Sequence, residues 1–227
     1  MRVAQPGPVS PPPSKADYVY DVLRREIHES RLPGGTSLRA AAVAARLGVS
    51  VTPVREALRR LETDRLVTYA AHRGATVVDL GPDALREFYG VRAAVEGVGA
   101  RFAATRIDAA GLERLESLHD RMVRDAARGR TARLAALSDE LHLAVTDIGG
   151  PAFLGGQARA IRTSFPVPQG ASLWLDPELR EANLAAHADL IAALRDRDPA
   201  RAERVMVAHV TASGQFRIDA QGHRTRH

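Results

Sequence analysis

Cysteine is absent from the sequence and aromatic side chains are scarce, and each shortage excludes something. Without cysteine the chain has neither disulfides nor thiolate ligands for a metal ion, a composition compatible with a reducing cytoplasm. Aromatic residues make up only 4% of the chain, while alanine, leucine, arginine and glutamate are abundant. These residues lose little free energy in a helix, so the composition predicts a mainly α fold.

Long apolar runs are also missing. No stretch of about 18 consecutive apolar residues occurs, as a membrane-spanning helix would need. The opening segment MRVAQPGPVSPPP lacks the apolar centre of a secretory signal. We therefore expect a soluble cytoplasmic protein with no membrane partner. Residues 1–14 contain five prolines and almost no large apolar side chains, which predicts a disordered tail.

Lysine is nearly absent, because Lys15 is the only one and arginine carries almost all the positive charge. The formal net charge is +5 and the isoelectric point is about 10.3. This excess of positive charge has two explanations. Either the protein binds an anionic partner, or the base composition of the genome favours arginine codons. Both remain open until the charges are located.

The length of 227 residues predicts two domains. A Leu-Gly-Pro-Asp turn at residues 80–83 is the expected boundary. Residues 15–79 then form the first domain and residues 80–220 the second. Residues 221–227 are expected to be a flexible tail.

The first domain begins with apolar residues at helical spacing from Asp17, which predict a helix that ends before a Leu-Pro-Gly-Gly turn. A short second helix covers residues 40–47, and Gly48 ends it in the left-handed conformation. The third helix follows almost at once, with Thr52 as its N-cap and Pro53 at its first position.

Residues 67–78 (VTYAAHRGATVV) alternate in character and predict a two-stranded hairpin with Arg73 and Gly74 at its tip. Three helices and a small hairpin in about 65 residues form a winged helix-turn-helix. The apolar stripe of the third helix, which should pack on the other two, consists of Val54, Ala57, Leu58 and Leu61.

The opposite side of the third helix carries Thr52, Arg55 and Arg59. A planar guanidinium donates two hydrogen bonds to guanine O6 and N7, and a threonine contacts a phosphate or a thymine methyl. Arg73 could reach a phosphate or the minor groove, and Gly74 would allow a close backbone approach. We predict that this face binds the major groove of double-stranded DNA.

An arginine-rich helix face is usually just solvated. Here it occurs together with a tight glycine turn, a proline near the helix start and a basic hairpin tip, and this combination favours DNA binding. Arg60 lies at the edge of the face, where solvent exposure and phosphate contact remain equally open.

The second domain contains only helical patterns, separated by short glycine- or proline-containing connections. Short connections place consecutive helices antiparallel, so we expect an all-α antiparallel bundle. The predicted helices cover residues 83–104, 108–128, 131–148, 152–164, 176–196 and 199–219.

Three predicted bundle helices each place one histidine on or beside their core face: His142, His187 and His209. A single histidine in such a place is more often a core residue bonded to a neighbour. Burying three imidazoles independently would require three sets of partners, so three together favour a shared divalent metal ion. Zinc, nickel, manganese and iron all bind neutral imidazole.

Arg92 and Glu96 interrupt the apolar pattern of the first bundle helix. A charged pair one helical turn apart is either a structural ion pair or part of a binding cavity. Both interpretations remain open from the residues alone.

The string PVREALRRLE at residues 53–62, with the Arg-Gly of the hairpin, resembles the DNA-binding domain of the GntR superfamily. Similar members carry an arginine that contacts DNA where this chain has Val51. The resemblance therefore implies operator binding through Arg55 with one contact changed.

Residues beyond the boundary resemble the FCD effector domain of the FadR-like branch, so the likeness spans about residues 16–219. Such domains bind a metal ion with three histidines and an aspartate four residues before the first one. That position is Ser138 here, and Asp139 is the candidate substitute; water in its place, or loss of metal affinity, are the alternatives. The resemblance also implies that Arg92 binds an anionic effector, for which a small carboxylate is expected.

The resulting hypothesis is a homodimeric regulator of transcription, not an enzyme. Two recognition helices bind a palindromic operator and an effector changes their spacing. A repressor is favoured and an activator stays open. The alternatives are a metal-dependent hydrolase, or a bundle with structural histidines that responds to a protein partner.

Overall fold

The computed structural model divides into two compact units between Asp79 and Leu80, at the boundary expected from the sequence. Each unit is described by itself. No helix in the described part of the chain is long and apolar enough to cross a membrane. The structure describes residues 14–28, 31–70, 74–79, 81–164 and 171–224.

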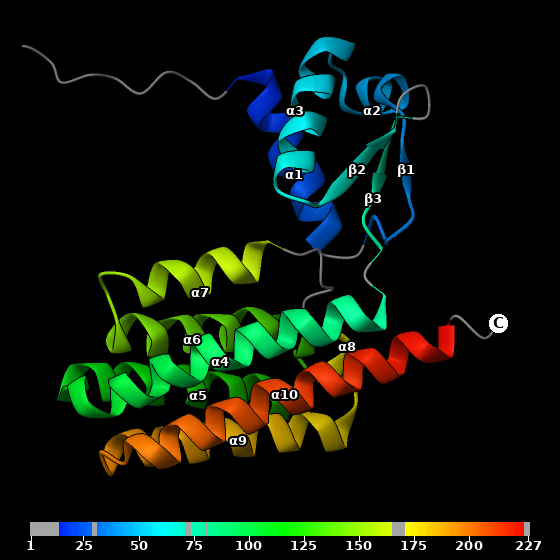
Figure 1. The fold of residues 1–227 in the computed structure, drawn as a ribbon. Coiled ribbons are helices and arrows are strands. Elements are labelled where there is room, and N and C mark those ends of the chain that lie inside the picture. The colour runs from blue at the N-terminus through cyan, green and yellow to red at the C-terminus, as the bar shows by residue number, and fades with distance from the viewer. Residues whose placement is uncertain (1–13, 29–30, 71–73, 80, 165–170, 225–227) are drawn as a thin grey trace, which may run out of the picture. The chain divides into compact units, whose positions relative to one another are not determined.

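The first unit is a winged helix-turn-helix, as predicted (Figure 1). Its small sheet has the order β1-β3-β2 with both pairings antiparallel. The sequence predicted only the hairpin, because a strand of two residues is too short to show an alternating pattern. The elements are α1 (Lys15–His28), β1 (Ser37–Leu38), α2 (Ala40–Leu47), α3 (Val51–Thr63), β2 (Val67–Ala70) and β3 (Gly74–Val77).

The apolar core of this unit confirms the predicted pattern of α3. All four residues of its predicted stripe are buried, and they pack with Leu23 and Ile27 of α1. Gly48 ends α2 with φ 66°, the left-handed conformation that was expected. This packing fixes which side of α3 remains exposed.

The start of α3 corrects one prediction. Ser50 is the N-cap, and Thr52 and Pro53 lie inside the first turn as its second and third residues. Proline is tolerated there because the first four N–H groups of a helix have no partner within the helix. The turn between α2 and α3 is therefore shorter than expected.

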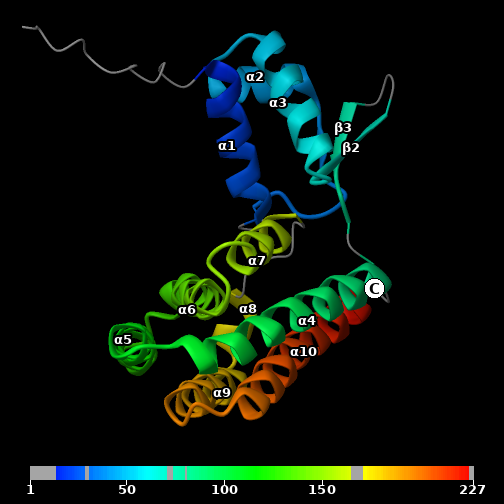
Figure 2. The ribbon, with the colours of Figure 1, turned by 60° about the vertical axis from the view of Figure 1, so that its left-hand side comes forward.

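The second unit is an all-α antiparallel bundle in which α4 and α10 lie side by side along much of their length (Figures 1 and 2). Helix α10 continues past residue 220, where the end of the domain was expected. One of the proline-containing connections expected between the helices, at residues 166–168 (Pro-Val-Pro), lies outside the described residues. The helices are α4 (Pro82–Arg106), α5 (Ala109–Ala127), α6 (Leu134–Gly149), α7 (Leu154–Thr163), α8 (Ala171–Leu175), α9 (Pro177–Arg195) and α10 (Pro199–Arg224), and a 3-10 turn covers Thr131–Arg133.

Side-chain caps and prolines set several helix starts. The Asp108 carboxylate accepts a hydrogen bond of 2.7 Å from the Gly111 N–H at the start of α5. Asp176 does the same for the Leu179 N–H at the start of α9, at 3.0 Å. Each cap satisfies an N–H group that has no partner in its own helix. The sequence located these boundaries closely because caps are local.

Helices α4 and α6 approach closely where Gly99 meets the end of α6. A Cβ atom on Gly149 would overlap the carbonyl oxygen of Gly99, and a Cβ on Gly99 would lie 3.3 Å from the Cα of Thr146. The Arg106 guanidinium donates a hydrogen bond to the Gly149 carbonyl across the same contact. The small residues thus allow two backbones to touch.

We expect Gly149→Ala to destabilise the helical unit by about 1 to 3 kcal/mol, because the added methyl group forces α4 and α6 apart. Gly156→Ala is the matched control: its Cβ would meet no atom within 4 Å, and alanine is favoured over glycine in a helix. Chemical denaturation followed by circular dichroism measures both variants. Equal stability of the Gly149→Ala variant and the wild type would contradict the close contact.

Candidate functional site

The exposed side of α3 presents the residues that were predicted to read DNA. Thr52, Arg55 and Arg59 are all exposed, on the side opposite the buried stripe. Neither arginine forms an ion pair with any other residue in the described part of the chain. Their guanidinium groups are therefore available to an external acceptor such as a base edge or a phosphate.

Arg60, beside this face, is engaged within the unit. Its Nη1 donates a hydrogen bond of 2.6 Å to Asp17 Oδ1 of α1, and its guanidinium lies 4.4 Å from the centre of the Tyr20 ring. Hydrogen bonds from Arg60 and from Ser14 lower the pKa of Asp17 to about 2. These contacts tie α3 to α1 and distinguish Arg60 from Arg55 and Arg59.

Two residues at the tip of the hairpin, Arg73 and Gly74, were also predicted to contact DNA. Arg73 lies outside the described residues. Gly74 begins β3 with φ 85°, and a Cβ atom there would lie 3.2 Å from the carbonyl oxygen of Leu38 in β1. Gly74 therefore has a local reason to be glycine, separate from any approach to DNA.

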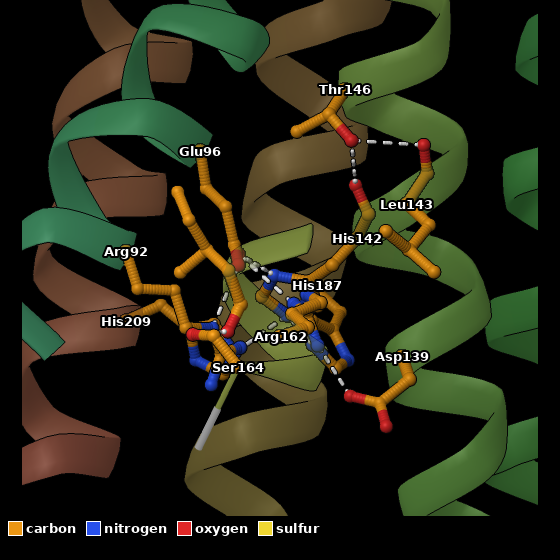
Figure 3. A network of polar contacts seen from close by, with 11 residues as sticks. Arg92, Glu96, Asp139, His142, Leu143, Thr146, Arg162, Ser164, His187 and His209 are labelled. Carbon is orange, nitrogen blue, oxygen red and sulfur yellow. Dashed lines mark hydrogen bonds and ion pairs between the residues drawn. The ribbon is translucent and has the colours of Figure 1, made fainter. Parts of the chain in front are cut away.

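In the second unit, three histidines meet inside the bundle. His142 of α6, His187 of α9 and His209 of α10 point their imidazole rings toward one another (Figure 3). The Nε2 atom of His142 lies 3.1 Å from that of His187 and 3.1 Å from that of His209. The structure thus brings together the three histidines that were predicted to share a site, and we call them the histidine cluster.

Burial keeps these imidazoles neutral. His142 and His187 are essentially inaccessible to solvent. Burial, together with the adjacent His142, lowers the pKa of His209 to about 3. Burial likewise holds the pKa of His187 well below its usual value. Neutral imidazole is the form that binds metal ions.

Glu96 of α4 contacts the outer side of the cluster. Its Oε2 lies 2.7 Å from His142 Nδ1 and 3.0 Å from Arg162 Nη2, and its Oε1 accepts a hydrogen bond of 2.7 Å from Arg92 Nε (Figure 3). Burial would raise the pKa of Glu96, but the charges of Arg92 and Arg162 outweigh it and hold the pKa well below its usual range. The carboxylate is therefore ionised in the core.

The predicted carboxylate ligand, Asp139, is not part of the histidine cluster. Its Oδ1 accepts a hydrogen bond from Arg162 Nη1 instead. Ser138 borders the same cavity but provides only a hydroxyl group. The expected set of one carboxylate and three histidines is thus reduced to three histidines, because an ion pair holds Asp139.

The histidine cluster fits a divalent metal ion. Two nitrogens bound at about 2.1 Å to one ion lie about 3.0 to 3.4 Å apart for bond angles of about 90° to 110°. The 3.1 Å separations from His142 fall in this range. One Nε2 lone pair cannot satisfy both neighbours as an acceptor, whereas a cation would accept one lone pair from each ring.

A cavity of about 60 Å³ adjoins the cluster. It exceeds the roughly 10–15 Å³ that one water molecule requires. Arg92, Arg162 and Arg217 contribute three positive charges to its wall, against two negative charges from Glu96 and Asp139 beside them. The other lining residues include Phe88, Tyr89, Ser138, His142, Leu173, Trp174, Asn183, His209 and Ser213. The excess of positive charge favours an anionic guest.

Several residues of this cavity were not singled out from the sequence. Arg162 and Arg217 look like ordinary charged positions of surface helices, and Trp174 lies on α8, which was not predicted. Burial of Arg162, at 8% exposure, is the observation that identifies it, and no local pattern carries that information. Arg92, in contrast, lines the cavity as expected.

Comparison with known proteins covers both units. Residues 15–77 match the model of "Bacterial regulatory proteins, gntR family", and residues 87–212 match that of the FCD domain. The chain is 32% identical over 199 residues to a protein of Paenarthrobacter nicotinovorans described as "Probable D-xylose utilization operon transcriptional repressor", covering 87% of this chain and 86% of the relative.

Other relatives agree with this family. The HTH-type transcriptional repressor RspR of Escherichia coli is 28% identical over 194 residues, covering 85% of this chain and 84% of the relative. The solved structure of E. coli McbR/YncC superposes with a TM-score of 0.75 at 22% identity, over 92% of this chain and 99% of that one, which shows the same fold. The chain therefore belongs to the GntR family of transcriptional regulators and carries an FCD domain after its winged helix-turn-helix.

Proposed function

We propose that the protein is a metabolite-responsive repressor that binds a palindromic operator as a homodimer. The observation that carries the proposal is a cationic cavity beside converging neutral histidines, in a chain that also exposes an arginine-bearing recognition helix. Two of the relatives described above are named as repressors, which favours that sign of regulation.

Operator recognition would use the free side of α3. Arg55 and Arg59 lie one turn apart on the exposed side of the helix, and Thr52 precedes them. Two copies of this helix, related by a twofold axis, would read two half-sites whose spacing matches the dimer. An effector that favours one arrangement of the two copies then changes operator affinity.

The metal ion would be held by His142, His187 and His209, with zinc, nickel, manganese or iron as candidates. When bound, the ion would supply positive charge and open coordination positions to an anionic ligand. Asp139 would not be a ligand while Arg162 holds it. This is a departure from the expectation that Asp139 completes the site.

The effector would be a small carboxylate. Arg92 uses its Nε to donate to Glu96. Among the residues that the structure describes, none accepts a hydrogen bond from its two terminal nitrogens. A guanidinium edge binds a carboxylate through two parallel hydrogen bonds. Arg92 can therefore anchor the carboxylate while the cavity encloses the rest of the molecule.

The operator contact is tested with Arg55→Ala. We expect the affinity for an operator selected by the wild type from random duplexes to fall by about 1 to 3 kcal/mol, because a two-bond contact to guanine is lost. Fluorescence anisotropy at fixed salt measures the affinity. Arg114→Ala, which removes an exposed arginine of α5, is the control and should bind as the wild type does. Unchanged affinity of the Arg55→Ala variant would refute its assigned role.

The metal site is tested by elemental analysis of purified protein. We expect about one divalent ion per wild-type chain and a large loss in His187→Ala, because one of three ligands is removed. His119→Ala is the matched control, since His119 bonds to the Leu184 carbonyl outside the cluster. Protein without metal, or equal metal content in wild type and His187→Ala, would eliminate the metal from the proposal.

The effector class is tested by thermal unfolding with a panel of small organic acids, with and without metal. A ligand that binds only the folded state stabilises it by about 2.7 kcal/mol at one hundred times its Kd. We expect at least one acid to raise the melting temperature of the wild type and to lose this effect in Arg92→Gln. Arg86→Gln, in an exposed ion pair with Asp83 on the same helix, is the control. Full stabilisation of Arg92→Gln would show that Arg92 does not bind the acid.

A further inference from the structure

Glu96 is the one carboxylate in the described chain that contacts the histidine cluster, and it does so on the far side from the other two rings. It contacts Nδ1 of His142, whereas the Nε2 atom of His142 faces His187 and His209. Only 1% of Glu96 is exposed to solvent. Glu96 therefore lies behind the cluster and is not a member of it.

The contact with Glu96 favours one position for the proton of His142. An ionised carboxylate only accepts hydrogen bonds, so Nδ1 of His142 carries the hydrogen and donates it to Glu96 Oε2. In a neutral imidazole the other nitrogen then has its lone pair free. That lone pair belongs to Nε2, the atom at the centre of the cluster.

Other contacts fix the place of His142 and Glu96 as well. Arg92 and Arg162 bind the two oxygens of Glu96 and hold its carboxylate in place. On α6, the close approach to α4 at Gly99 and Gly149 sets the distance between the two helices. The His142 ring is thus held in direction by contacts within the protein.

We propose that Glu96 is a positioning residue that fixes the tautomer and ring orientation of His142 and thereby sets the affinity of the histidine cluster for a divalent cation. The inference deepens the proposed function and rests on its metal site. It assigns the buried Arg92–Glu96 pair a role beyond an ordinary ion pair. Because Arg92 and Arg162 also line the cavity, Glu96 connects the anion-binding wall with the histidines.

The test compares two variants of Glu96 by calorimetric titration of metal-free protein with nickel chloride. Glu96→Gln removes the charge at nearly constant size, and Glu96→Asp keeps the charge but withdraws it from His142. We expect both to weaken nickel binding by about 10- to 100-fold, the usual effect of losing such a partner. Glu116→Gln, in the exposed pair with Arg195, is the control and should bind as the wild type does.

The aspartate variant separates positioning from charge balance. If Glu96 serves only to neutralise the two arginines, Glu96→Asp binds nickel as the wild type does, and the proposal is overturned. Circular dichroism shows whether each variant is folded. Should Glu96→Gln fail to fold, the charged Glu96→Asp variant still decides the question.

A second readout needs no metal. In protein labelled with ¹⁵N-histidine, nitrogen chemical shifts report which ring nitrogen carries the hydrogen. We expect the Nδ1–H tautomer for His142 in the wild type, and a mixture of tautomers in Glu96→Asp. The opposite tautomer in the wild type would overturn the proposal. If the wild type bound no nickel but showed the expected tautomer and its change, the metal site would fail while the positioning by Glu96 stood.

Discussion

The helical unit depends on one buried ionic contact, in which Glu96 is shared by Arg92, Arg162 and His142. Taking a carboxylate out of water costs several kcal/mol unless charged and hydrogen-bonding partners replace the solvent. Here two guanidinium groups and one imidazole replace it. Three helices, α4, α6 and α7, supply the groups that meet around this point, so their packing and the chemistry of the cavity cannot be separated.

Some arginines of the two units are paired within the protein, while others have no ion-pair partner among the described residues. In the winged helix-turn-helix, Arg60 binds α1 through Asp17, while Arg55 and Arg59 remain open on the same helix. In the bundle, Arg162 bonds to both Asp139 and Glu96. The abundance of arginine in the composition therefore does not by itself indicate an anionic partner, because a guanidinium is suited both to ion pairs within the protein and to external anions.

Periodic and local signals were enough to predict much of the molecule from its sequence. The buried stripe of α3, the end of α2 at Gly48 and the convergence of three histidines depend on helical spacing or on one residue's backbone. Long-range partners were not predictable. Nothing near Asp139 in the sequence shows that Arg162, in another helix, binds it, and the two-residue β1 has no pattern of its own.

The histidine cluster draws its members from α6, α9 and α10, and Glu96 comes from α4. Contacts between residues so far apart in the chain form late in folding, because distant segments must first be brought together. A nascent chain therefore has no complete cluster until α10 has been synthesised. Helix α3 belongs to a separate unit made much earlier. A growing polypeptide would consequently possess its winged helix-turn-helix before the histidine cluster could form.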